Sequence, residues 1–413
     1  MLTTLAAPAF ADTWCIENGN ITVKAGDTEG TNKVSQGSII DREDTNTIIT
    51  NSDKDTASSN TVTIDAGNDK VEVTLDNVNI KAGSGSALTS KGDVTLTLKG
   101  DNHLTGGISD TGNYGRNGIA STGSLTISGG STVTANGGNG GNVSGDGISS
   151  NGSVTISGGT VKAAGGDSKD GYGGDGIRSD GGVTISGNTV NAAGGSGGKV
   201  GGYGICSFDR VAISGGTVTA NGGDGSSGGD GIRSGDIDLS GSLELTAKAG
   251  SPNGKALSQR GNELDLDDIK DKLGPGAKVT ATDANGETKQ VSIPRPVEPE
   301  EPSSSSDGGS ATPSTPASPL PGLTVTDKSG AVISYTSTQS GNTLTVCVGR
   351  LTASFRISLA ALRQLRAEGI EAITFQTILC STTLSVDELL AMGGEDAEAV
   401  LTHRSTDSSL TVG

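Results

Sequence analysis

A short phrase built around the dipeptide Gly-Ile returns at nearly constant intervals through the middle of the chain. Successive copies are 29, 29, 28 and 27 residues apart and begin at Gly118, Gly147, Gly176, Gly204 and Gly231. After each dipeptide come a segment such as SVTISGG, a second segment such as TVKAAGG, and a loop. A regular period of this length is typical of solenoid proteins, in which a unit buries its apolar side chains only by stacking on its neighbours.

Apolar and polar residues alternate within these segments. Val154 and Ile156 lie on one face of SVTIS, and Thr155 lies on the other. A period of two residues predicts strands rather than helices. Equivalent strands of stacked coils pair in parallel, and parallel crossovers are nearly always right-handed. We therefore predict an all-β fold, a right-handed parallel β-solenoid with coils of about 27–31 residues. Its internal ladder would consist of Ile119, Ile148, Ile177, Ile205 and Ile232.

The composition fits thin layers of small apolar residues. Among 413 residues there are 68 glycines but only 4 Tyr, 4 Phe and 1 Trp. Glycine is expected at corners that need a positive φ or leave no room for a Cβ. The net charge of −18 argues against a nucleic-acid partner and against a polybasic membrane contact. No apolar stretch is long enough to span a bilayer, so we expect no membrane insertion.

The composition also changes along the chain, which predicts five parts. The segment MLTTLAAPAFA contains a small-x-small pattern suited to signal-peptidase cleavage, although an ordinary Ala-rich tail is the alternative. We read residues 294–322, rich in Pro and Ser, as a linker. The predicted parts are a signal-peptide remnant (1–11), an N-terminal cap with the first coils (12–60), the solenoid (61–293), the linker (294–322) and a small α+β module (323–413). A secreted or cell-surface protein is expected.

The last part of the chain predicts mixed secondary structure. AVISYTS and TLTVCVG, on either side of QSGN, suggest a hairpin. SLAALRQLRAEG predicts a helix with Ser358 as N-cap and Gly369 just beyond its end. SVDELLAM carries a capping box formed by Ser385 and Glu388. No catalytic motif is visible in this module.

Several repeat phrases resemble a known family. VTLTLKGDNHLTGG, GIASTGSLTISGGSTVTANGG and the GDGIRSDGGVTISG rungs resemble bacterial secreted proteins that contain a carbohydrate-binding domain. The resemblance covers roughly residues 60–250. It implies a right-handed parallel β-helix akin to that of polysaccharide lyases. It also implies binding of an extracellular polysaccharide without cleavage, sometimes with Ca²⁺.

Two columns of residues are candidates for carbohydrate binding. The outward strand positions form a hydroxyl face with Thr126, Thr155 and Thr184. Such a face suits solvent, but it could also hydrogen-bond a sugar chain or order water as in ice-binding solenoids.

Tyr114 and Tyr172 each stand four residues before a Gly-Ile pair, with Tyr203 nearby in the next coil. If the loops stack in register, the rings of Tyr114 and Tyr172 lie about 10 Å apart and could each stack on a sugar. Alternatively, each ring folds down onto its own glycine-rich loop.

Two acidic columns are candidates for Ca²⁺. Asp146, Asp175 and Asp230 each precede a Gly-Ile glycine, and Asp167 and Asp224 follow the GG of the strand after it. Stacking brings like carboxylates close together, which makes their ionisation costly unless the loops splay apart or a divalent cation lies between them. The alternative is that Asp-Gly simply forms turns.

Little in the sequence favours catalysis. We expect His103 and His403 to be surface residues, with no zinc spacing around either. A lyase would need an arginine base, for which Arg178 and Arg233 in the GIRS phrases are the candidates.

The alternatives to a non-catalytic binding or adhesin-like protein are therefore a polysaccharide lyase and a structural stalk without ligand. Cys347 could pair with Cys380 in an exported protein, the pairing of Cys15 stays open, and Cys206 is expected at an outward position.

Overall fold

The computed structural model describes residues 12–294 and 322–412, apart from gaps at 328–330, 334, 341, 349–351, 378–380, 395–396 and 404–407. The chain divides into two compact units, Met1–Pro299 and Glu300–Gly413. The predicted signal-peptide remnant, all but the ends of the predicted linker, and Cys380 lie outside the described residues.

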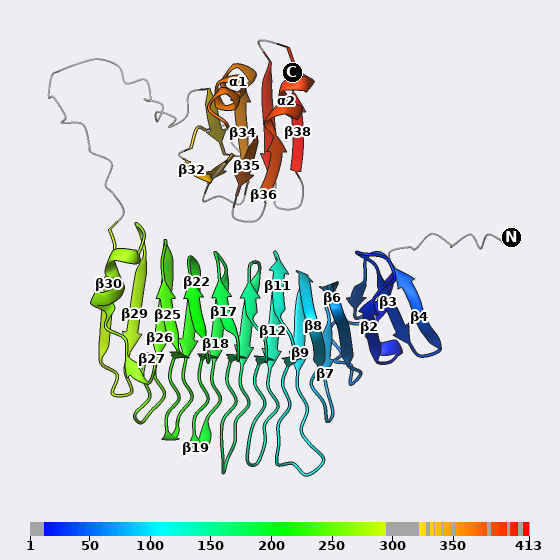
Figure 1. Ribbon diagram of the computed structural model, residues 1–413, viewed down its shortest axis with the longest axis vertical. Helices are drawn as coiled ribbons and strands as arrows, with labels where there is room; N and C mark the ends of the chain where they lie inside the picture. Colours follow the sequence, from blue (N-terminus) through cyan, green and yellow to red (C-terminus); the bar gives the residue numbers. More distant parts are fainter. Residues whose placement is uncertain are drawn as a thin grey trace. The chain divides into compact units, whose positions relative to one another are not determined.

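The first unit is a parallel β-solenoid of about 10 turns, as the repeat predicts (Figure 1). A representative coil begins with β13 (Ile148–Ser150), continues through β14 (Val154–Ile156) and β15 (Thr160–Ala164), and returns through a loop to β16 (Ile177–Ser179). Each strand pairs in parallel with its counterpart in the next coil. Three strand columns and one row of loops therefore make up the body of the solenoid.

The columns are made of equivalent strands. The first column starts with β8 (Leu88–Lys99) and continues with β10 (Ile119–Ser121), β13, β16, β20 (Ile205–Ser207), β24 (Ile232–Ser234) and β27 (Leu257–Gln259). The second contains β6 (Val62–Asp76), β8, β11 (Leu125–Gly129), β14, β17 (Gly182–Ile185), β21 (Arg210–Ile213) and β25 (Asp236–Leu239). The third contains β7 (Asn79–Lys81), β9 (Asp101–Thr105), β12 (Thr132–Asn136), β15, β18 (Thr189–Ala193), β22 (Gly216–Asn221), β26 (Leu243–Lys248) and β29 (Lys278–Thr282).

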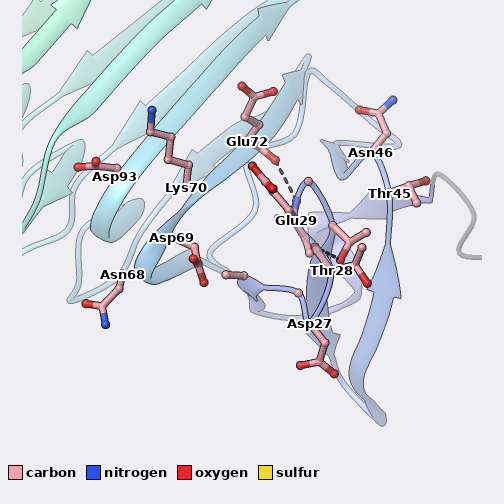
Figure 2. A pocket seen from close by; sticks show the side chains of 15 residues that line it. Asp27, Thr28, Glu29, Thr45, Asn46, Asn68, Asp69, Lys70, Glu72 and Asp93 are labelled. Carbon is pink, nitrogen blue, oxygen red and sulfur yellow. Dashed lines mark hydrogen bonds between the residues drawn. The ribbon is translucent and has the colours of Figure 1, made fainter.

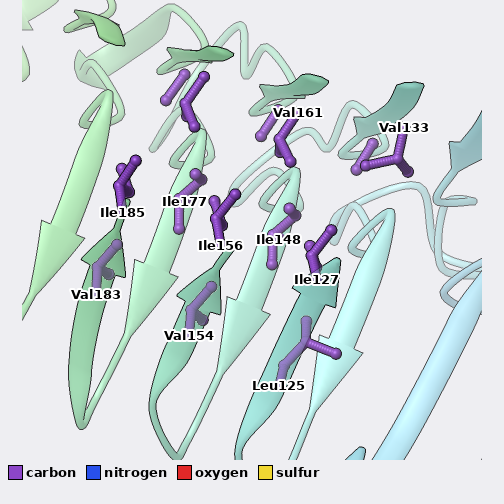
Figure 3. Packing of buried hydrophobic residues seen from close by; sticks show 14 of the residues in the cluster. Leu125, Ile127, Val133, Ile148, Val154, Ile156, Val161, Ile177, Val183 and Ile185 are labelled. Atoms are coloured by element: carbon purple, nitrogen blue, oxygen red, sulfur yellow. The ribbon is translucent and has the colours of Figure 1, made fainter. Parts of the chain in front are cut away.

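Stacked apolar side chains fill the interior of the coils (Figure 3). The predicted isoleucine ladder is confirmed, because all five members are fully buried and adjacent members are in register: Ile119, Ile148, Ile177, Ile205 and Ile232. Val154 and Ile156 of β14 lie opposite Val183 and Ile185 of β17. Each layer is thin, which explains how the solenoid manages with so few aromatic residues.

Antiparallel strands cover both ends of the stack. At the N-terminal end, β2, β3 and β4 form an antiparallel meander, whereas β1 and β5 still pair in parallel. These strands are β1 (Thr13–Cys15), β2 (Ile21–Ala25), β3 (Asn32–Gln36), β4 (Ile39–Asp44) and β5 (Ile48–Thr50). At the C-terminal end, β28 (Asn262–Glu263), the 3₁₀ helix η2 (Leu266–Lys272) and β30 (Thr288–Ser292) fold back on the last coil. Such caps protect strand edges that would otherwise be open to pairing.

Glycine has the expected role at the corner between the second and third strands. The corner glycines share a positive φ and are Gly129, Gly159, Gly187, Gly216 and Gly241. Residues with a Cβ rarely adopt this conformation.

The second unit is a small α+β module, as predicted. One sheet contains β31 (Leu323–Thr326), β34 (Ala353–Ser358), β37 (Glu398–His403) and β38 (Ser408–Val412). The other contains β32 (Thr336–Ser340), β33 (Thr343–Cys347), β35 (Ala372–Gln376) and β36 (Ser381–Ser385). The predicted hairpin is β32–β33. Helices α1 (Leu359–Ala367) and α2 (Val386–Met392) begin at the predicted caps, where Ser358 and Ser385 accept backbone N–H groups.

One expectation about a single residue was wrong, and one residue at its predicted position is more buried than that position suggests. His403 is fully buried rather than exposed, because β37 runs through the module core and the ring packs edge-on against Phe355. Burial lowers the pKa of His403. Cys206 occupies the predicted outward position of its strand but is only 3% exposed, since its register partners on either side are Arg178 and Arg233. His103 is exposed, as expected.

Candidate functional site

The loops between the third strand of one coil and the first strand of the next form a regular row beside the solenoid (Figure 1). Each loop has an outgoing arm and a returning arm, and backbone hydrogen bonds connect them alternately within and between loops. Gly145 donates to Gly138 of its own loop, and Gly166 of the next loop donates to Gly145, both at 2.9 Å. The same pattern continues through Gly174, Gly195, Gly202, Gly223, Gly229 and Gly250.

The loop arms approach so closely that only glycine fits. A Cβ on Gly174 would lie 1.9 Å from the carbonyl oxygen of Gly145, and one on Gly202 would lie 1.8 Å from that of Gly174. Neither glycine has a positive φ. The requirement is therefore the absence of a side chain rather than backbone conformation, as at the crowded axis of collagen. The sequence analysis expected lack of room for a Cβ at the corners between strands. The structure shows this crowding mainly in the loops.

Four side chains at the loop tips form a column that we name the loop-tip ridge: Tyr114, Val143, Tyr172 and Val200. Successive members are joined by parallel β-bridges, so the loops stack in register as the tyrosine prediction requires. Tyr114, Val143 and Tyr172 are 51%, 40% and 49% exposed. Ile108, which is also exposed, lies beside the ridge through a bridge to Gly115. The ridge is thus an apolar strip whose first three members are exposed and whose last member, Val200, is half-buried. Exposed apolar surface of this kind marks binding surfaces.

Polar contacts hold the tips in place. Buried Ser144 accepts the N–H of Gly140 at 2.9 Å, and buried Ser168 donates to the carbonyl oxygen of Gly141 in the preceding loop. The N–H of Tyr114 donates to the Ser109 hydroxyl at 3.0 Å. The Lys199 ammonium lies 5.9 Å from the centre of the Tyr172 ring, a cation–π distance. The tyrosines are therefore presented on tied turns.

Tyr203 is not a member of this ridge. It occupies the position directly before Gly204, at the base of its loop, while Val200 stands in register with Tyr172. The Tyr203 ring packs against Arg233, whose Cζ lies 5.0 Å from the ring centre, and its hydroxyl accepts a hydrogen bond from the same guanidinium. The structure brings together Tyr114 and Tyr172 but places Tyr203 in another column.

Sequence reasoning missed Val143, Val200 and Ile108 as surface residues. Val143 stands four residues before Gly147, and Val200 stands four before Gly204. Aligning the repeats at this position, and not only the tyrosines, would have revealed the whole column.

The first acidic column forms a ladder of hydrogen bonds along the loop bases. Asn117 Oδ1 accepts the N–H of Asp146 at 2.8 Å, Asp146 Oδ1 accepts that of Asp175 at 2.8 Å, and Asp175 Oδ1 accepts that of Tyr203 at 2.7 Å. Asp230 accepts the N–H of Lys255 in the same way. Each side chain therefore satisfies a backbone donor of the following coil.

The second acidic column forms a similar ladder on the outgoing arms. The N–H of Asp167 donates to Asn139 Oδ1, and Asp167 Oδ1 accepts the N–H of Ser196 at 2.7 Å. Asp224 accepts the N–H of Ser251 at 2.8 Å. Asp167 and Asp224 are exposed, unlike Asp175 and Asp230, which are buried.

In these ladders one carboxylate oxygen of each aspartate is already hydrogen-bonded, which leaves the other oxygen for a cation. Calcium needs about six to eight oxygen ligands, yet Oδ1 of each aspartate is already bonded to a backbone N–H. The guanidinium of Arg178 lies 3.5 Å from Asp175 Oδ2, where it supplies a positive charge of its own. Among the described residues, no three or more His, Cys, Asp or Glu side chains are grouped so as to hold a metal ion. Calcium binding remains a prediction, which a melting experiment can test.

Burial and mutual repulsion perturb the central carboxylates. Burial, followed by the charge of Asp146, raises the pKa of Asp175 from 3.8 to about 7. Burial likewise raises the pKa of Asp146, despite hydrogen bonds from Asp175 and Ser149. Near neutral pH the pair therefore retains a proton for part of the time.

The coil that contains β20 and β21 departs most from the repeat. Its outward residues include Tyr203, Cys206, Phe208, Arg210 and Ala212, where other coils have mainly Asp, Ser, Asn and Thr. Phe208 is 61% exposed, and Arg178 stacks on it with Cζ 5.1 Å from the ring centre.

Arg178 and Arg233, the candidate lyase bases, each contact groups of the protein itself. Arg178 pairs with Asp175, and Arg233 contacts Tyr203. Burial, followed by the charge of Asp175, raises the pKa of the Cys206 thiol to about 12, which leaves it protonated and unreactive.

The predicted threonine face is present on the second strand column. Thr126, Thr155 and Thr184 are in register and point outward, with Thr126 and Thr155 half-buried and Thr184 exposed. The column continues into Ala212 and Asp238, so the hydroxyl array ends there. It is a second surface, on the strands of the coil rather than on its loops, and Thr95 of β8 extends it in the other direction.

A polar cleft of about 660 Å³ lies where the N-terminal cap meets the first coils, β6 and β8 (Figure 2). Its lining includes Glu29, Asp69, Lys70, Glu72 and Asp93. None of the residues predicted to bind carbohydrate or metal contributes to it.

Within the described parts of the chain, no helix is both long and apolar enough to cross a membrane. A comparison with protein-family models, curated proteins and solved structures finds no match for this chain.

Proposed function

We propose that this protein is a non-catalytic, extracellular polysaccharide-binding solenoid that contacts its ligand through the loop-tip ridge. The observation that supports this proposal is the in-register column of Tyr114, Val143, Tyr172 and Val200 on loops tied together by their backbones. Tyrosine combines a large apolar face with a hydroxyl group, which suits a wet sugar-binding surface. A surface held rigid in advance also loses little conformational entropy when it binds.

The position of the tyrosines favours binding over stabilisation. Both rings are about half exposed, so burying them further in a ligand would remove apolar area from water. Backbone bridges and the Ser109 and Ser168 contacts hold the turns, and both rings remain about half exposed, which supports a binding role over a plug for the loop.

The test is a glycan array with the wild-type chain and with the double variant Tyr114→Ala, Tyr172→Ala. We expect the wild type to bind a polysaccharide and the double variant to bind at least about tenfold more weakly, with an unchanged circular dichroism spectrum. Phe208→Ala is the matched control, since it removes an exposed ring outside the ridge. Equal affinity of the double variant would remove the ridge from the proposal.

Two other functions would give different results. A structural stalk would bind no glycan on the array. A polysaccharide lyase would release unsaturated products from pectin, which absorb ultraviolet light, and Arg178→Ala or Arg233→Ala would abolish the release.

A further inference from the structure

The side chains of the loop-tip ridge repeat every two coils, whereas the backbone of the solenoid repeats every coil. Tyrosine and valine alternate along it, on four consecutive coils. Neighbouring parallel strands are about 4.8 Å apart, so a ring recurs about every 10 Å along the row. The backbone beneath the ridge repeats at every coil, whereas the aromatic surface repeats at every second coil.

We propose that the ridge selects an extended β-1,4-linked glycan lying along the row of loops, an inference that rests on the proposed function. In such a chain each sugar is turned over relative to the previous one, so every second sugar presents the same face. Tyr114 and Tyr172 would each meet that face. The smaller Val143 between them leaves room for the sugar that is turned the other way.

Other linkages do not fit a straight row of this kind. Glucans with β-1,3 or α-1,4 linkages wind into helices, so equivalent faces of successive sugars turn away from a flat strip. Parallel bridges join each tip of the ridge to the next, so its four members stay in register from coil to coil.

Charge favours an uncharged chain. The protein has a net charge of −18, while in the loops of Tyr114 and Tyr172 exposed Asp110 and Asp170 are balanced by exposed Arg116 and Lys169. The net charge of the whole protein repels an acidic polysaccharide but not a neutral β-1,4 glycan. The nearby Lys199 can donate hydrogen bonds to sugar hydroxyls.

Isothermal titration of the full chain with three hexasaccharides of glucose tests the inference. Cellohexaose, laminarihexaose and maltohexaose have the same composition and differ only in linkage. We expect cellohexaose to bind at least about tenfold more tightly than the other two. Within the cello-oligosaccharides, affinity should rise steeply at the trisaccharide, the shortest chain that reaches both tyrosines.

A positional swap keeps the composition of the ridge and changes only its period. Val143→Tyr combined with Tyr172→Val places the two rings on adjacent coils, and Val143 is exposed enough to accept the larger side chain. We expect the swap to lose the preference for cellohexaose while its circular dichroism spectrum stays unchanged.

The outcomes separate this inference from the proposed function. Equal binding of the three hexasaccharides, or a swap variant that binds cellohexaose as well as the wild type does, would overturn the selection by linkage. Strong binding of another glycan class on the array, without cellohexaose binding, would overturn it too and leave the proposed function in place. Failure to bind any glycan on the array would overturn both.

Discussion

The strands and the loops of one coil are held to their neighbours in opposite ways. The strands stack through apolar side chains, such as the ladder of fully buried isoleucines that includes Ile148 and Ile177. The loops stack mainly through backbone hydrogen bonds, to which Ser168 and the aspartate ladders add side-chain bonds, and their glycines leave no space for a methyl group between adjacent arms. Order in a long loop therefore does not require a core of its own.

This difference explains where the aromatic residues of the solenoid lie. Thin strand layers are filled by Val, Ile and Leu, and the packed glycine arms need no side chains, so neither region uses tyrosine for stability. Tyr114 and Tyr172 are instead exposed at the tips of the tied loops. The two regions should therefore respond differently to substitution, most strongly in the strands and less strongly in the loops.

The largest effect is expected in the strand ladder. Ile177→Asp places a carboxylate without a partner in the apolar interior, and we expect it to cost more than about 3 kcal/mol of unfolding free energy. Thr184→Asp, at an exposed position of the same coil, is the control and should change stability little. Urea denaturation followed by circular dichroism measures both. Wild-type stability in the Ile177 variant would refute the buried ladder.

In the loops, a single methyl group should be sufficient to disturb the packing. Gly174→Ala forces a Cβ against the backbone of the preceding loop, and we expect a loss of about 1–3 kcal/mol. Gly130→Ala is the matched control, because its Cβ would meet nothing within 4 Å and its φ is not positive. It should be neutral or slightly stabilising. Equal urea midpoints for the two variants would show that the loop arms are not closely packed.

The ladder at the loop bases should make stability depend on pH. The pKa of Asp175 is raised from 3.8 to about 7 in the folded protein, so the folded state holds a proton that the unfolded state releases. Its contribution to stability is complete below pH 3.8 and is lost as pH rises towards about 7.

Asp175→Asn keeps the acceptor for the Tyr203 N–H and removes the titrating group. We expect this variant to be more stable than the wild type at pH 8 by more than about 1 kcal/mol, and to show a flatter profile between pH 4 and pH 7. Asp167→Asn, in the exposed ladder, serves as the control. Parallel pH profiles for wild type and Asp175→Asn would contradict the buried, protonated pair.

Calcium is expected to have the smallest effect. The ladders leave only one oxygen of each aspartate for the predicted calcium site, so we expect a small rise of the melting temperature in millimolar calcium relative to chelator. A ligand that binds only the folded state raises its stability by mass action. Asp146→Asn with Asp175→Asn should abolish the rise, and equal melting temperatures of the wild type in calcium and in chelator would leave these aspartates as turn formers.

The parts of the structure that repeat were predictable from the sequence, and the parts that depend on close contact were not. The Gly-Ile period and the Val154/Ile156 alternation predict the coil, its strands and the isoleucine ladder, because each follows from spacing alone. The same spacing predicts that Tyr114 and Tyr172 are two coils apart. It does not show that the carboxylate of Asp146 accepts the N–H of Asp175, because that requires the height and tilt of adjacent loops.

Two further failures have a similar cause. His403 lies on the buried face of β37 together with Ala399 and Leu401, and its burial depends on packing against Phe355, which is distant in sequence. Glycine was expected at the corners between strands, for a positive φ or for lack of room for a Cβ, whereas close contact between backbones requires it in the loops as well.

Amide hydrogen exchange tests most directly the central claim, that the loop row is as ordered as the strands beneath it. The amides to compare are those of Gly145, Gly174 and Gly202 in the loops with those of Val154, Val183 and Val211 in the strands. If the backbone network holds the loops, the two sets should be protected to within about one order of magnitude, because they open together with the coil. Loop amides that exchange at the rate of an unprotected chain, while the strand amides stay protected, would contradict the account.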